Sequence, residues 1–104
     1  MTPIAVVTTV GSREEARAMG RAMVERRLAA CAQIAAIDSY YEWEGVVRED
    51  AEYRVTFKTV AERYAGLEEA IRAMHSYELP AIHAVALERC YAPYAAWIEH
   101  NTSG

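Results

Sequence analysis

Three side chains in this sequence could together bind a metal ion, although none has the spacing of a known metal motif. Copper and zinc sites need thiolate, imidazole or carboxylate groups that converge to within about 2.0 to 2.3 Å of one point. Cys31, His75 and Glu78 supply these groups. They are far apart in the chain or flank a predicted loop, so only the fold can bring them together. We name them as candidate metal ligands.

Each candidate also has an ordinary structural interpretation. Cys31 lies in a mostly apolar stretch and could be a small buried hydrophobe, and His75 could favour the negative end of a helix. Lys58, the only lysine, could form an ion pair with Glu78, with Tyr77 hydrogen-bonded beside it. The functional alternative places all five side chains in one cleft near a subunit junction, where ligand sites often occur.

The apolar patterning predicts the elements that must position these residues. Residues 4–10 favour a strand buried on both faces, and Ser12 with Glu15 forms a capping box that starts a helix. Alternation at 53–59 predicts another strand. A second capping box at 59–62 starts a helix whose apolar stripe includes Met74 and which ends near His75. A last strand at 81–88 and a short helix from Pro93, with Tyr94, Trp97 and Ile98 facing inward, complete the chain.

A period-two pattern over residues 29–43 predicts an unusually long strand. About fifteen residues would span roughly 50 Å, so its far half should project beyond a compact domain. Tyr40, Tyr41 and Trp43 lie at that far end. The acidic stretch Glu44–Glu52 is interpreted as a solvated hairpin loop. Because a small domain cannot cover these aromatic rings by itself, we expect other copies of the chain to cover them.

Length and composition set the class of protein. The chain has 104 residues, a net charge of −4 and two cysteines without CxxC spacing, so we expect one domain over residues 1–104 and no structural disulfide. The scattered basic residues argue against a nucleic-acid partner. No apolar run has the roughly 18 to 20 residues of a membrane span. We expect a cytoplasmic protein with an α+β, ferredoxin-like β-α-β-β-α-β sandwich, an antiparallel sheet and an extra C-terminal helix.

Four blocks of residues carry a resemblance to a known family: Leu-Ala-Ala-Cys at 28–31, Tyr-Tyr-Glu-Trp-Glu-Gly at 40–45, Lys-Thr at 58–59 and His-Ser-Tyr-Glu-Leu-Pro at 75–80. In order and spacing they are similar to the CutA divalent-cation tolerance proteins, from about residue 4 to 98. The resemblance implies a cytoplasmic homotrimer whose long strands pair with neighbouring subunits. It also implies binding of copper or other divalent ions, and no established catalysis. Copper ligands have been assigned in some members of that family. The positions of this sequence that correspond to them are Thr8, Met74 and His75.

We therefore predict a homotrimeric metal-binding protein that is not an enzyme. Its predicted site comprises metal ligands Cys31, His75 and Glu78, an inter-subunit cleft with Lys58 and Tyr77, and a trimer interface formed by the aromatic residues at 40, 41 and 43. The alternative is a regulatory module similar to the trimeric PII signalling proteins, which would bind a nucleotide or another small anion between subunits. A third reading is an enzyme with Cys31 as nucleophile and His75 as base.

Overall fold

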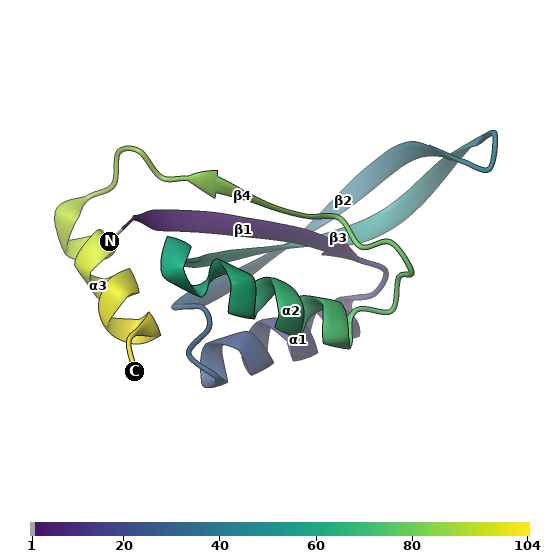
Figure 1. The fold of residues 1–104 in the computed structure, drawn as a ribbon. Coiled ribbons are helices and arrows are strands. Elements are labelled where there is room, and N and C mark those ends of the chain that lie inside the picture. Colours follow the sequence, from purple (N-terminus) through teal and green to yellow (C-terminus); the bar gives the residue numbers. More distant parts are fainter. Residues whose placement is uncertain (1) are drawn as a thin grey trace.

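The structure is a computed structural model that describes residues 2–104. Its strands and helices follow the predicted order β-α-β-β-α-β with an additional C-terminal helix, which confirms the ferredoxin-like fold (Figure 1). The elements are β1 (Pro3–Val10), α1 (Arg13–Glu25), β2 (Cys31–Trp43), β3 (Val46–Val60), the 3₁₀ turn η1 (Ala61–Arg63), α2 (Tyr64–Met74), β4 (Ile82–Ala86) and α3 (Ala92–Thr102).

The four strands form one antiparallel sheet in the order β2-β3-β1-β4, and α1 and α2 cover one of its faces (Figure 1). Alternate residues of β1 are therefore fully buried, while those between them are only half-buried. The prediction that this strand is buried on both faces is wrong for the single chain, because the two helices pack on one side only. The core beneath them consists mainly of Val6, Val10, Met19, Met23, Val55, Phe57, Leu67 and Ile71.

Strands β2 and β3 extend beyond the rest of the sheet as a two-stranded ribbon. Pairing of β1 with β3 ends at Val10 and Tyr53, so residues 37–52 pair only with one another, up to the last pair, Trp43 and Val46. We call residues 37–52 the ribbon. Figure 1 shows it projecting away from the helices, and the molecule measures 45 × 25 × 21 Å.

The predicted solvated loop at Glu44–Glu52 is wrong, because most of this acidic stretch is strand. Only Glu44 and Gly45 form the turn, and both have left-handed backbone angles, with φ of 52° and 79°. Such angles match the tight turns that join twisted strands. The exposed charges that suggested a loop lie on a ribbon that this chain leaves open to solvent.

One of the two predicted helix caps is present. The Ser12 hydroxyl accepts a hydrogen bond from the backbone N–H of Glu15 at 3.1 Å, as predicted for the start of α1. The cap expected from Thr59 is wrong, because its side chain is buried on β3 and donates to the carbonyl of Leu28 at 2.8 Å. The following helix starts instead through η1, with no side-chain cap.

Helix α3 closes the end of the sheet farthest from the ribbon tip (Figure 1). Ile98 is buried against Ala30 and Val60, with Tyr94 packed beside them. Trp97, predicted to face inward, is nearly half exposed and stacks on Tyr94 with ring centroids 5.9 Å apart. No helix within residues 2–104 has the length and apolar character needed to cross a membrane.

Candidate functional site

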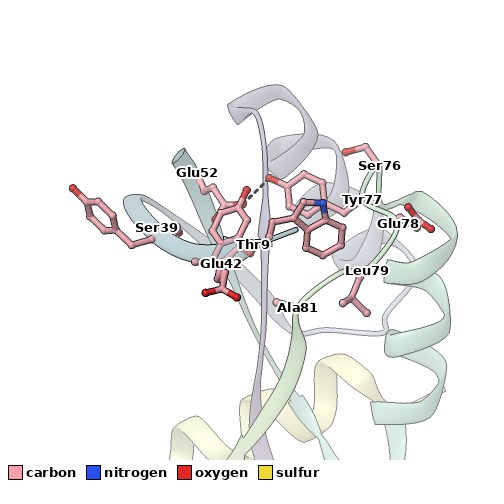
Figure 2. A pocket seen from close by; sticks show the side chains of 12 residues that line it. Thr9, Ser39, Glu42, Glu52, Ser76, Tyr77, Glu78, Leu79 and Ala81 are labelled. Atoms are coloured by element: carbon pink, nitrogen blue, oxygen red, sulfur yellow. Dashed lines mark hydrogen bonds between the residues drawn. The ribbon is translucent and has the colours of Figure 1, made fainter. Parts of the chain in front are cut away.

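An open cleft of about 770 Å³ lies between the ribbon and the loop that joins α2 to β4. Ribbon side chains line one wall, and loop residues 76–79 with Ala81 line the other. Figure 2 shows Tyr77, Glu78 and Leu79 on the loop side. The cleft lies where the ribbon leaves the sheet. The lining residues are Thr9, Ser39, Tyr40, Tyr41, Glu42, Trp43, Glu52, Ser76, Tyr77, Glu78, Leu79 and Ala81.

A hydrogen bond from Tyr77 to Glu52 joins the two walls of the cleft. The Tyr77 hydroxyl donates to Glu52 Oε2 at 2.6 Å (Figure 2), and Glu52 as a residue is only 7% exposed. Burial, and then the bond to the Glu52 carboxylate, raises the pKa of Tyr77 well above its usual value. A Cβ at Gly11 would lie 3.2 Å from this hydroxyl, a tight contact that glycine avoids.

A second tyrosine–carboxylate pair lies within the ribbon. The Tyr41 hydroxyl donates to Asp50, and this bond raises the pKa of Tyr41. Tyr41 lies opposite Arg48 and Asp50 lies opposite Ser39, so the bond runs diagonally across the two strands. The wall formed by the ribbon therefore presents aromatic rings together with carboxylates.

The loop wall is held in place by Glu15 and His75. The Glu15 carboxylate accepts from the Ser76 backbone N–H and hydroxyl, each at 2.9 Å. The His75 ring is fully buried. Its Nδ1 accepts from the Tyr77 backbone N–H at 3.1 Å, which leaves Nε2 to donate to the Thr9 carbonyl at 2.8 Å. Both nitrogens of His75 are therefore used to fix the loop.

The structure brings together five of the eight residues predicted for the site. The cleft contains two predicted site residues from the loop, Tyr77 and Glu78, and the three ribbon aromatics at 40, 41 and 43. The His75 ring lies directly behind the loop wall, with its centroid 4.9 Å from that of the Tyr77 ring.

Cys31 and Lys58 lie elsewhere on the sheet. Cys31 of β2 pairs with Lys58 of β3, and Lys58 pairs in turn with Ala5 of β1. His75 instead contacts Thr9, which lies four residues farther along β1. Four residues along a strand correspond to about 13 Å. Lys58 donates to Gln33 Oε1 at 3.0 Å, and the possible ion pair between Lys58 and Glu78 is not formed within residues 2–104.

The predicted metal ligands do not meet within one chain. No group of three or more His, Cys, Asp or Glu side chains in residues 2–104 is arranged to hold a metal ion. Met74, expected in the core, is 40% exposed at the end of α2. A site formed by Cys31, His75 and Glu78 would therefore need side chains from more than one copy, and it stays a prediction.

Sequence reasoning did not identify Glu52 as part of the site. It was assigned to the predicted loop, although it also fits the alternation of the strand that follows. In the structure, Glu52 is the last residue of β3 before the part that pairs with β1, and its carboxylate faces Tyr77. Glu15 was assigned to the capping box alone, because its contact with Ser76 joins positions 61 residues apart.

The fold and the cleft define a ferredoxin-like α+β protein with a projecting strand pair and an aromatic, acidic cleft at its base. The chain belongs to the CutA1 divalent ion tolerance protein family, whose model matches residues 4–101.

Similar proteins come from distant organisms. The divalent-cation tolerance protein CutA of Thermus thermophilus is 39% identical over 98 residues, which cover 93% of this chain and 95% of that protein. The structure of the periplasmic divalent cation tolerance protein CutA from Archaeoglobus fulgidus has a TM-score of 0.95 at 33% identity, over 97% of this chain and 99% of that one. CutA1 from Oryza sativa has a TM-score of 0.96 at 31% identity, over 99% and 95% respectively.

Proposed function

We propose that this protein is a cytoplasmic homotrimer that binds divalent metal ions, copper among them, without catalytic turnover. The observation that carries the proposal is the open ribbon beside the cleft. Tyr40, Tyr41 and Trp43 are 67%, 40% and 42% exposed on a two-stranded extension. Such a hairpin is marginally stable alone in water, and large exposed apolar patches mark interaction sites. The names of the relatives, divalent-cation tolerance proteins, support the metal-binding part.

The proposed ligands come from neighbouring copies of the chain. Glu78 is exposed at the cleft, whereas Cys31 lies about 13 Å farther along the sheet from His75 in the same chain. A site with all three ligands would need Cys31 of one copy to lie beside Glu78 of another. His75 would have to release the Tyr77 N–H or the Thr9 carbonyl to bind the ion. Metal affinity should therefore depend on assembly.

Two measurements on the purified protein test the proposal. Light scattering coupled to gel filtration should give three times the chain mass of 11.6 kDa. Calorimetric titration should show saturable heat with Cu(II) or Zn(II), and Glu78→Gln and His75→Ala should each reduce it. His83→Ala, an exposed histidine on β4, is the matched control and should bind as the unmodified chain does.

Each alternative has its own outcome in the same experiment. A monomer at micromolar concentration would contradict the trimer. No metal heat, together with saturable heat on adding ATP, would support the PII-like alternative instead. Metal heat unchanged in both Glu78→Gln and His75→Ala would reject these two residues as ligands.

A further inference from the structure

The cleft at the base of the ribbon contains a buried carboxylate with one oxygen free. Glu52 is only 7% exposed, and its Oε2 accepts the hydrogen bond from the Tyr77 hydroxyl (Figure 2). No donor among residues 2–104 bonds to its Oε1, yet this atom is not one of the fully enclosed side-chain atoms that lack a partner. Because Glu52 lines the cleft, this oxygen remains open to it. A group that binds there must therefore donate a hydrogen bond.

The charge of the cleft favours a cation. Glu42, Glu52 and Glu78 line it, and its lining within residues 2–104 includes no lysine, arginine or histidine. The ribbon as a whole, residues 37–52, has six acidic residues and one basic residue, so it carries all of the net negative charge of the chain. A cleft lined by one sign of charge concentrates ions of the opposite sign. The occupant that fits this chain is therefore positively charged.

The aromatic walls of the cleft favour an organic cation over a bare metal ion. Tyr40, Tyr41, Trp43 and Tyr77 line it, and the faces of such rings attract cations and offer apolar surface to an alkyl chain. A hard divalent cation instead needs several oxygen ligands at about 2.0 to 2.6 Å. Within the described part of this chain, no group of three or more His, Cys, Asp or Glu side chains is arranged to hold one.

We infer that the cleft binds an aliphatic diammonium ion, with one ammonium group donating to Glu52 Oε1. A protonated primary amine, like that of lysine, has three N–H donors and no acceptor. It can therefore bond to this carboxylate, whereas a quaternary ammonium ion has no N–H to donate. The methylene chain would lie between Tyr41 of the ribbon and Tyr77 of the loop. The exposed carboxylates of Glu42 and Glu78 would attract the second ammonium group.

This inference goes beyond the proposed metal binding and does not require the trimer. Glu52 and Tyr77, which carry it, belong to one chain, and neither is a proposed metal ligand. In the proposed trimer, a neighbouring copy would cover the outer end of the cleft near the ribbon tip and leave the base, with Glu52, to the ligand. The two ideas can therefore fail independently.

The test is a calorimetric titration of chelator-treated protein with 1,4-diaminobutane at about pH 7.5, where both amines are protonated. We expect saturable binding of one diamine per chain. Butylamine, which has a single ammonium group, should bind more weakly. Tetramethylammonium, which has no N–H donor, should give no saturable heat. These three ligands are compared on the unmodified chain, so the comparison does not depend on the folding of any variant.

Two isosteric variants locate the binding. Glu52→Gln should weaken diamine binding by about 10- to 100-fold, the range for a hydrogen bond to a charged group. This change removes the charge and keeps an oxygen that can accept from Tyr77. Glu49→Gln, at an exposed ribbon carboxylate that does not line the cleft, is the matched control and should bind as the unmodified chain does. Circular dichroism establishes that each variant is folded.

Three results would overturn the inference, because the charge of the ribbon or its rings alone would then account for binding. They are undiminished binding in folded Glu52→Gln, equal weakening in Glu49→Gln, and tetramethylammonium binding as tight as that of butylamine. Absence of saturable diamine heat would also overturn it, whether or not Cu(II) or Zn(II) binds. Diamine heat in a chain that gives no metal heat would reject the metal-binding part of the proposed function alone.

Discussion

At the scale of single residues, the main feature of this structure is a set of phenols bonded to acidic groups or thiols. Tyr77 donates to Glu52, Tyr41 to Asp50 and Tyr64 to Glu68, while Tyr94 contacts Cys31. A phenol that donates to a carboxylate resists losing its proton, and burial adds to this resistance. These phenols therefore make the free energy of unfolding depend on pH in the alkaline range more strongly than exposed tyrosines would.

We expect the free energy of unfolding to decrease as pH rises above about 10, the usual tyrosine pKa. The pKa of Tyr94 is raised to about 12 in the folded chain, and that of Tyr77 is also raised. Between these values the unfolded chain loses protons that the folded chain keeps, which favours unfolding. The contribution is complete below about pH 10 and is lost as pH rises toward about 12.

Urea unfolding at several pH values between about 9 and 11.5 measures this effect. Tyr94→Phe and Tyr77→Phe should each make the decrease with pH shallower. Tyr91→Phe, at a tyrosine that is 78% exposed and lies outside the ribbon, is the matched control and should leave the decrease as it is. Equal pH dependence in all three variants would show that these hydroxyls do not couple to folding.

At the scale of elements, the ribbon is the part of the chain that determines the shape of the cleft. Its base is fixed by β1, and its tip is closed by a turn of only Glu44 and Gly45. The opposite wall depends on Glu15 of α1, which holds Ser76 of the loop. The cleft therefore combines one wall supported by a helix with one wall supported by a single strand pair.

Gly45→Ala should destabilise the ribbon by about 1 to 2 kcal/mol, because a left-handed backbone places Cβ too close to the following carbonyl. Gly45 has φ of 79° and nothing lies within 4 Å of a Cβ built there, so the cost is conformational rather than steric crowding. Amide hydrogen exchange at residues 43 and 46 measures it. Glu44→Asn, at φ of 52°, is the matched control and should slow exchange instead, because asparagine tolerates this angle. Unchanged exchange in Gly45→Ala would contradict the turn geometry.

At the scale of the whole molecule, the single chain covers one face of its sheet with α1 and α2 and leaves much of the ribbon exposed. The outer edges of β2 and β4 also have no partner strand among residues 2–104. Proteins protect such edges because they otherwise pair with further strands. The proposed trimer would cover the aromatic residues and the edges with the same contacts.

Trp43→Ala should weaken assembly as well as stability. The indole is 42% exposed in the single chain, and removing a tryptophan that becomes fully buried costs about 3 to 5 kcal/mol. Dilution series followed by light scattering should show the variant dissociating at a higher concentration than the unmodified chain. Trp97→Ala, at a tryptophan of similar exposure on α3, separates a ribbon effect from general loss of apolar area. Equal dissociation of the two variants would argue against the ribbon as the interface.

The sequence alone determined the order of elements and the projecting strand, because both follow from local periodicity. Apolar residues recur with the spacing of a helix or a strand, and the strand pattern over residues 29–43 is longer than a compact sheet can accommodate. The Ser12 cap was also predictable, since donor and acceptor are three residues apart.

Only the tertiary structure decided which chemical groups meet. Glu52 reaches Tyr77, Cys31 contacts Tyr94 instead of His75, and Lys58 turns to Gln33. These contacts join residues distant in the chain, so their distances depend on strand register and helix packing, which local patterns do not encode.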